Sequence, residues 1–247
     1  MAPVLTAVTD RVHLAQTPLV NWTLVSDDSG VILIDAGFPG SREDVVASLD
    51  RLGFAPSDVR AILLTHAHID HLGTAIWFAA THRTPVYCHV DEVGHAKREY
   101  LQQVAPAALM TQAWRPRWLM WSLQVAGNGG LVRKGIPSTR ALTDEIAATL
   151  PGRPVALPTP GHTGGHCSYI VDGVLVSGDA LITGHPLASH RGPQLLPAMF
   201  NHSDADCVRS LSTLAEAGTE VLIPGHGDLW TGPIREAVSQ AMPSRPA

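Results

Sequence analysis

Short apolar runs separated by turn residues make up the first third of the chain, and their alternation predicts β-strands. After Gly30 the run VILIDAG is almost continuously apolar, as expected of a strand that is buried on both faces. A helix is predicted over 41–52, because Ser41 precedes a segment of helical character and Gly53 follows it. The strands predicted before Gly30 cover 4–8, 11–16 and 21–26.

The order of strand, helix and strand continues through the rest of the chain, which is typical of a layered α/β fold. A buried strand at 59–65 is followed by an apolar helix at 73–82 and a strand at 84–90. A second helix is predicted at 204–218, with apolar positions at helical spacing and a closing glycine. The later strands are predicted at 154–162, 166–171, 173–179 and 220–227.

The region 91–145 differs from the rest because it contains no clear strand pattern. Trp114, Trp118 and Trp121 are spaced by four and then three residues, which predicts that they share one face of a helix. Between positions 97 and 140 the chain carries seven basic residues and one acidic residue. We therefore expect a basic, tryptophan-rich helical insertion within a protein whose formal net charge is -5.

Composition argues against two classes of protein, disordered chains and proteins that bind nucleic acid. Hydrophobic residues make up 45% of the 247 positions and charged residues 16%, which favours one folded domain over 1–247 and argues against disorder. The acidic balance gives no overall basic field, so nucleic acid is not expected as a partner.

Cysteine usage and the absence of long apolar runs bear on the compartment. Cys88, Cys167 and Cys207 are widely spaced and form no CxxC pair, so we expect packing roles in a reducing environment. No apolar run reaches the length of a membrane span, and the first residues lack a secretory pattern. A cytoplasmic location without a transmembrane segment is the expectation.

The stretch LLTHAHIDHLG, residues 63–73, places three histidines and an aspartate directly after an apolar strand. On a helix His66 and His68 would project about 200° apart, whereas on an extended segment they share a face. Asp70 and His71 then follow at the corner toward the next helix. These side chains suit a divalent metal such as zinc, but one short motif cannot complete two coordination shells.

Further ligand types occur where other predicted strands end in glycine turns. His162 lies in TPGHTGGH, Asp179 in VSGDA and His226 in IPGHGD. Because open α/β sheets bind ligands at the carboxyl ends of their strands, these side chains can converge with the first cluster. The sequence therefore predicts a metal centre built from several segments.

At these motifs the chain resembles the metallo-β-lactamase superfamily, in its glyoxalase II-like or lactonase-like branch. The motifs THAHIDH, PGHTGGH, GDA and PGHG occur in the family's order, from LIDAG onward. The resemblance implies a four-layer αββα sandwich with a two-metal site. It also implies that one metal is held by His66, His68 and His162, the other by Asp70, His71 and His226, with Asp179 bridging them.

The resemblance further implies a hydrolase with two divalent metal ions, most simply Zn²⁺, with Fe or Mn as alternatives. Two such ions supply a bridging hydroxide at neutral pH and polarise the substrate's carbonyl or phosphoryl oxygen. Asp70 is the expected catalytic residue, orienting the hydroxide and passing a proton to the leaving group.

Other polar and aromatic residues are candidates for the surroundings of the metals. We expect Asp35 and His166 to support the ligands through hydrogen bonds. His185 is expected either to line the pocket or to lie in a solvated loop. Trp114 and Trp118 are candidates for the wall of a lid over the metals, although packing of the insertion onto the domain explains them equally well.

The expected substrate is a small anionic or amphipathic ester, lactone or thioester, because the insertion offers both tryptophans and arginines. The same surface is open as a homodimer or membrane contact. Two other functions remain open: a mononuclear iron enzyme resembling persulfide dioxygenases, and a metal-dependent binding module without turnover. Metal content and a substrate panel distinguish the three.

Overall fold

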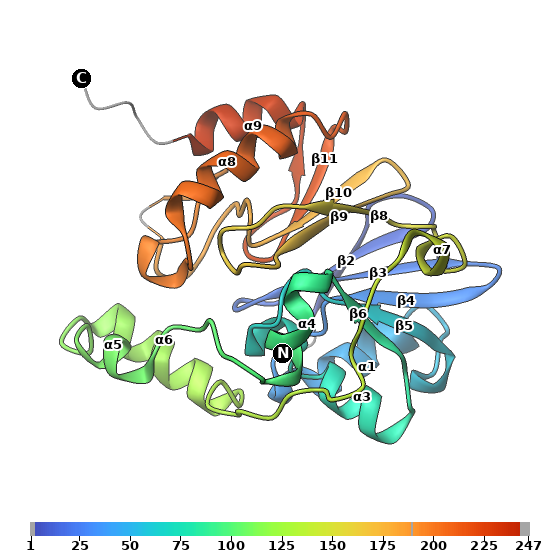
Figure 1. The fold of residues 1–247 in the computed structure, drawn as a ribbon, viewed down its shortest axis with the longest axis horizontal. Helices are drawn as coiled ribbons and strands as arrows, with labels where there is room; N and C mark the ends of the chain where they lie inside the picture. Colours follow the sequence, from blue (N-terminus) through green and yellow to red (C-terminus); the bar gives the residue numbers. More distant parts are fainter. Residues whose placement is uncertain (1–2, 189, 243–247) are drawn as a thin grey trace.

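The computed structural model describes residues 3–188 and 190–242 and contains two β-sheets packed face to face (Figure 1). The first has the order β1-β2-β3-β4-β5-β6-β7 and the second the order β12-β11-β10-β9-β8. The first comprises β1 (Val4–Ala7), β2 (Val12–Gln16), β3 (Asn21–Asp27), β4 (Gly30–Ile34), β5 (Val59–Leu63), β6 (Val86–Cys88) and β7 (Arg140–Ala141). The second comprises β8 (Val155–Pro158), β9 (Cys167–Val171), β10 (Val174–Gly178), β11 (Val221–Pro224) and β12 (Trp230–Thr231).

Helices cover the outer face of each sheet, which completes the four layers that the sequence predicts (Figure 1). α1 (Arg42–Asp50) and α3 (Ala75–Thr81) lie against the first sheet. α8 (Asp204–Ala215) and α9 (Ile234–Ala241) lie against the second. The expected αββα sandwich is confirmed.

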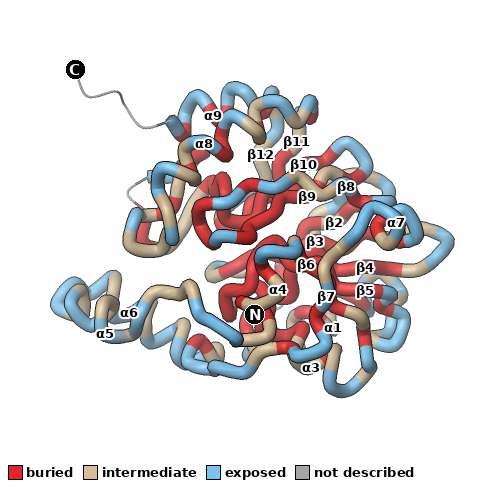
Figure 2. Tube along the Cα trace, in the orientation of Figure 1, coloured by how far each residue is buried: buried red, intermediate tan, exposed pale blue. Residues whose placement is uncertain are grey.

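The apolar pattern of the strands explains this layering. In β4 and β5, which pair in parallel, successive side chains are buried on alternate faces. Ile32 and Leu63 point into the core between the sheets, whereas Leu33 and Ile62 face α1 and α3. Figure 2 shows buried residues in the strands at the centre of the molecule and exposed residues around them.

The remaining helices lie in the connections between strands. They are α2 (Ile69–Leu72), α4 (Val93–Lys97), α5 (Pro106–Met110), α6 (Pro116–Gly127), α7 (Asp144–Ala147) and the 3₁₀ turns η1 (Pro39–Ser41), η2 (Pro56–Asp58), η3 (Val90–Glu92) and η4 (Ala198–Phe200). Among the described residues, no helix has the length and apolar character needed to cross a bilayer.

The insertion is helical, but two details of the prediction for 91–145 are wrong. Arg140–Ala141 forms β7, a two-residue strand that pairs in parallel with β6, so the chain re-enters the sheet before position 145. α6 begins at Pro116, whose ring fixes a backbone angle suited to a first helical turn, and Trp114 therefore lies outside the helix. α5 and α6 project beside the sandwich (Figure 1), and no residue of α6 is fully buried.

Candidate metal centre

The first ligand-type cluster lies where β5 ends and α2 begins. Residues 64–68 continue beyond the strand, and His68 is the residue before the first turn of α2, with an extended backbone. Asp70 and His71 lie in that turn. The chain therefore changes from an extended segment to a helical turn, as expected. This change directs His66 and His68 toward one part of the site and Asp70 and His71 toward another.

His162, Asp179 and His226 come from the second sheet. Asp179 directly follows β10, and His162 and His226 lie in the turns after β8 and β11. Gly225 makes this approach possible, because a Cβ atom there would lie 2.1 Å from Oδ1 of Asp179. The residue before His226 in IPGHGD therefore has to be a glycine if the Asp179 carboxylate is to keep its place.

The seven side chains meet in three groups whose ligand atoms lie within 4.8 Å of one another. Asp179 lies at the centre of the arrangement. Its Oδ2 is 3.3 Å from Nε2 of His162 and 3.2 Å from Nε2 of His226, and its Oδ1 is 3.5 Å from Nε2 of His71. The groups are His66, His68 and His162; His66, His71 and Asp179; and Asp70, His71 and His226.

Each of the five histidines has one ring nitrogen occupied by a protein oxygen on the side away from the cluster. Nε2 of His68 donates to the Gln102 carbonyl at 2.5 Å, and Nδ1 of His226 donates to the Leu19 carbonyl at 2.6 Å. The other three bonds are His66 Nδ1 to Thr65 Oγ1 at 3.0 Å, His71 Nδ1 to Asp35 Oδ2 at 2.8 Å and His162 Nδ1 to Asn201 Oδ1 at 3.0 Å.

These bonds fix the tautomers of the neutral rings. A nitrogen that donates outward leaves the other nitrogen with a free lone pair, and that lone pair points into the cluster. The nitrogens that face the cluster are Nδ1 of His68 and Nε2 of His66, His71, His162 and His226, and Nδ1 of His68 lies 2.9 Å from Nε2 of His162. This is the hydrogen-bond pattern that orients histidine ligands in metal sites.

The donor set fits a divalent metal in a second respect. Nε2 of His66, Nε2 of His71 and Oδ1 of Asp179 are buried without a hydrogen-bond partner. Unpaired buried polar atoms are costly, and metal ions bound in the cluster would give all three a partner. Zinc, iron and manganese all accept a donor set that combines imidazole nitrogen with carboxylate oxygen.

Without a cation, the charges of the cluster depend on its carboxylates. Burial lowers the pKa of His226, but Asp179 beside it, with help from Asp70, raises that pKa to about 10. Burial also lowers the pKa of His71, and Asp35, Asp179 and Asp70 outweigh it, so that this pKa lies well above its usual value. The pKa of His66 is well below its usual value, because burial and the neighbouring histidines both lower it.

Asp35 and His166 hold these ligand-type groups in place. Asp35 accepts hydrogen bonds from the backbone and hydroxyl of Thr65 as well as from His71. Its φ of 61° is a left-handed conformation that aspartate tolerates better than most residues. His166 accepts from the backbone N–H of Asp179 at 3.1 Å, and its Nδ1 bonds to Thr159 at 2.9 Å, so neither nitrogen is free for a metal.

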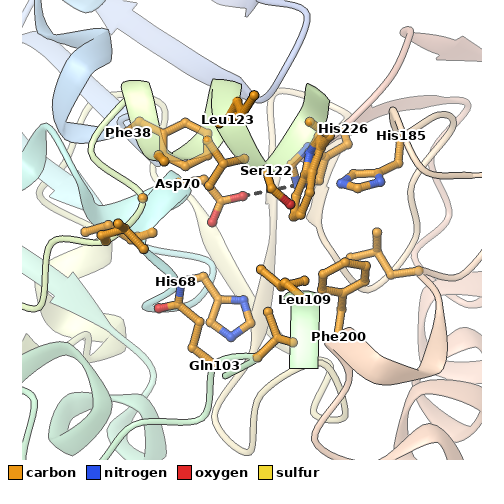
Figure 3. Close-up of a pocket in the computed structure, with 18 of the residues that line it drawn as sticks. Phe38, His68, Asp70, Gln103, Leu109, Ser122, Leu123, His185, Phe200 and His226 are labelled. Carbon is orange, nitrogen blue, oxygen red and sulfur yellow. Dashed lines mark ion pairs between the residues drawn. The ribbon is translucent and has the colours of Figure 1, made fainter. Parts of the chain in front are cut away.

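A cavity of about 450 Å³ opens onto the cluster and extends to the insertion. Figure 3 shows Asp70 and His226 facing each other at its inner end, 3.5 Å apart, with His68 beside them. The wall away from the metal cluster is largely apolar and includes Leu109, Leu119, Trp121, Leu123, Leu196 and Phe200. The cluster is thus open to solvent on the side where α5 and α6 lie.

The other predicted pocket residues have different positions. His185 lines the cavity and lies beside His226, with ring centroids 5.1 Å apart. Trp118 stacks on Phe200, while Trp114 is 74% exposed beneath the Arg115 guanidinium and does not reach the cavity.

Sequence reasoning missed several contributors to the site, and Phe200 and Glu92 are two of them. Phe200 reaches the cavity from η4, and the buried carboxyl of Glu92 contacts both histidine loops. Glu92 lies in the segment HVDEVGH, and the available signal was an acidic residue between two histidines shortly after the strand β6.

Comparison with known proteins agrees with this geometry. The sequence pattern of the Metallo-beta-lactamase superfamily matches residues 17–226. The chain belongs to this superfamily. It is 30% identical to "N-acyl homoserine lactonase AttM" of Azorhizobium caulinodans over 90% of this chain and 76% of that one. It is 28% identical to "Probable metallo-hydrolase YflN" of Bacillus subtilis over 85% and 80% of the two chains.

Solved structures extend the likeness to the whole fold of this metallo-hydrolase. A metallo-beta-lactamase family protein from Thermus thermophilus superposes with a TM-score of 0.64 at 24% identity, over 95% of this chain and 79% of that one. At that identity the likeness shows the fold, and the chemistry has to be argued from the site.

Proposed function

We propose that this superfamily member is a dinuclear, zinc-dependent hydrolase that cleaves the ester, lactone or thioester bond of an amphipathic acyl substrate. The observation that carries the proposal is the orientation of the five histidines. Each donates one N–H outward to the protein and turns its other ring nitrogen toward a shared cluster around Asp179.

In this proposal His66, His68 and His162 hold one ion, and Asp70, His71 and His226 hold the other. Asp179 lies between the two groups, within 4 Å of ligand nitrogens from both. Two divalent cations supply a nucleophilic hydroxide near neutral pH and polarise the carbonyl that is attacked. The chain's own residues then decide which substrate reaches them and where its protons go.

Asp70 is the proposed proton carrier. Its side chain is 21% exposed, whereas those of His71 and Asp179 are almost fully buried. It lines the cavity, so a substrate's leaving group can approach it there. Burial raises the pKa of Asp70, but His71 and His226 outweigh it and hold that pKa below its usual value, so the carboxylate is ionised at neutral pH.

His185 is suited to contact the substrate without binding metal. Its Nδ1 accepts a hydrogen bond from the backbone N–H of Leu187 at 3.1 Å, so its Nε2 carries the proton. In Figure 3 the ring lies beside His226 at the edge of the cavity. We expect this N–H to donate to an oxygen of the bound substrate.

The shape and chemistry of the cavity support an acyl substrate. Leu119 and Leu123 of α6 and Phe200 of η4 provide apolar surface in the cavity that opens onto the metal cluster. Arg133 lines the same cavity and can meet a carboxylate or other polar group. The relative named as an N-acyl homoserine lactonase supports this substrate class, because such a molecule joins an acyl chain to a lactone.

The test combines metal analysis with a substrate panel. Protein purified without added metal is analysed for zinc, iron and manganese, and hydrolysis of lactones, aryl esters and thioesters with acyl chains of increasing length is measured before and after chelation. Two metal ions per chain and chelator-sensitive hydrolysis are expected. One iron per chain with oxygen uptake on a persulfide would favour the dioxygenase alternative. Two bound metals without turnover on any of these substrates would favour the binding module.

The acyl pocket has its own test in two variants of α6. Leu123→Asp places a charge in the cavity wall, and we expect KM for a long-chain substrate to rise at least about tenfold, since a bound acyl chain would cover the unpaired charge and remove it from water. Met120→Asp is the matched control, because Met120 is 57% exposed, Leu123 is 59% exposed, and Met120 does not line the cavity. Equal KM values for the two variants would contradict the proposed pocket.

A further inference from the structure

Glu92 is a fully buried carboxyl group outside the metal cluster, at the end of η3. It accepts four hydrogen bonds, which come from the Ala67 N–H at 2.7 Å, the His95 ring at 2.7 Å, the Thr163 hydroxyl at 2.8 Å and the Gly165 N–H at 3.1 Å. Four donors are as many as a carboxylate has lone pairs to receive.

The two oxygens of Glu92 serve different loops. Oε1 accepts from Ala67, which lies between His66 and His68, whereas Oε2 accepts from the loop that follows His162. These loops belong to different sheets and are far apart in sequence. One carboxylate therefore joins the two segments that carry the three histidines of a single ligand group.

A second route connects Glu92 to the same group. His95 donates from Nδ1 to Glu92, and its Nε2 accepts from the backbone N–H of Gln102 at 3.3 Å. The carbonyl of Gln102 accepts from Nε2 of His68, and its side chain accepts from the Gly164 N–H at 2.8 Å. The bond that fixes the His68 tautomer is thus part of the network that begins at Glu92.

Close packing fixes the Glu92 segment against the second loop. A Cβ atom at position 165 would lie 2.3 Å from the backbone nitrogen of Glu92, so only glycine allows the approach. The other ligand group is held differently, because His71 donates to Asp35 and His226 to the Leu19 carbonyl.

We infer that Glu92 is a positioning residue that sets the spacing between the His66–His68 loop and His162, and so controls the affinity of one metal position and not of the other. The inference rests on the proposed function, since it requires that two metals bind. Residues that orient metal ligands typically change metal affinity about 10–100-fold when they are replaced.

Glu92→Gln is the direct test. Each oxygen of Glu92 accepts two hydrogen bonds. Glutamine replaces one of these oxygens with an NH₂ group, so the two donors that met this oxygen lose their acceptor while the size of the side chain is kept. Glu99→Gln is the matched control, because Glu99 is an exposed acidic residue on the same segment. Zinc is loaded into each protein, and its release to a chromophoric chelator is followed in time.

The two metal positions are distinguished in a His226→Ala background, which removes a ligand of the second group only. We expect Glu92→Gln to accelerate zinc release about 10–100-fold in this background. In the otherwise intact protein, one of two release phases should accelerate and the other should change less than about twofold, and cobalt loaded in place of zinc should show an altered absorption spectrum.

Thr163→Val provides a milder change, because it removes one of the four donors and keeps the side-chain shape. It should accelerate the same phase by a smaller factor, which keeps the inference testable if Glu92→Gln does not fold. Equal acceleration of both phases, or no change in either, would overturn the role of Glu92. Failure of the unaltered protein to bind two metals would instead overturn the proposed function.

Discussion

Removal of the metal ions should destabilise the protein by an amount that the structure allows us to bound. Three buried atoms in the cluster have no hydrogen-bond partner other than a cation, namely Nε2 of His66, Nε2 of His71 and Oδ1 of Asp179. Chelation leaves Nε2 of His66 without a partner and leaves only a long contact of 3.5 Å between Nε2 of His71 and Oδ1 of Asp179, which is why the lowest cost per atom is used. In the unfolded chain water satisfies all three, so the cost falls on the folded state alone.

An unsatisfied buried polar atom costs about 1–3 kcal/mol. Taking the lower value for each atom gives about 3 kcal/mol for the cluster. For a chain of this size, about 1 kcal/mol shifts the melting temperature by about 2–4 °C. The expected decrease in melting temperature on chelation is therefore at least about 6 °C.

The assay is thermal unfolding followed by circular dichroism, with metal content measured on the same samples. Re-addition of Zn²⁺ should restore the melting temperature, whereas the same concentration of Mg²⁺ should not, because imidazole ligands favour zinc over magnesium. A decrease below about 2 °C in protein shown to be free of metal would refute the argument that these atoms require a cation.

Two further predictions concern the same cluster. In the chelated protein, stability should be greatest near pH 6.5, the ordinary pKa of histidine. Burial lowers the pKa of His166 to about 3, so stability is lost as pH falls from 6.5 toward 3. The pKa of His226 is raised to about 10, so its contribution is lost as pH rises from 6.5 toward 10. Denaturant melts from about pH 4 to 9 check this, and a monotonic trend would contradict it. Gly225→Ala should weaken zinc binding at least about tenfold, because its Cβ would displace Asp179. Gly127→Ala, where a Cβ has no neighbour within 4 Å, should bind zinc normally, and equal affinities would argue against the steric reason.

The strands and the ligand-type residues could be predicted from sequence because both have local signals. The apolar strands β5 and β10 are followed closely by polar residues. In a strand, residues two positions apart point to the same face of the sheet. His66, His68 and Asp179 therefore had their positions implied by where the strands end. The glycines beside His162 and His226 marked the close approach of backbone that the turns require.

The insertion was predicted less well because its helices lack a buried face. α6 has no fully buried residue, so the tryptophan spacing gave only a weak constraint on where the helix begins. Pro116 decides that boundary, and it places Trp114 outside the helix while Trp121 reaches the cavity. Phe200 could not be assigned to the same wall, because its contact with α6 joins segments about eighty positions apart along the chain.

The hydrogen bonds that orient the ligands are the part of the site that sequence hides most completely. His68 and His226 donate to the carbonyl oxygens of Gln102 and Leu19, and every residue type supplies a carbonyl. No side-chain pattern can mark such positions. Glu92 is different, because only an acidic side chain can accept the four hydrogen bonds that meet at this position. Its replacement should alter a metal site that it does not touch.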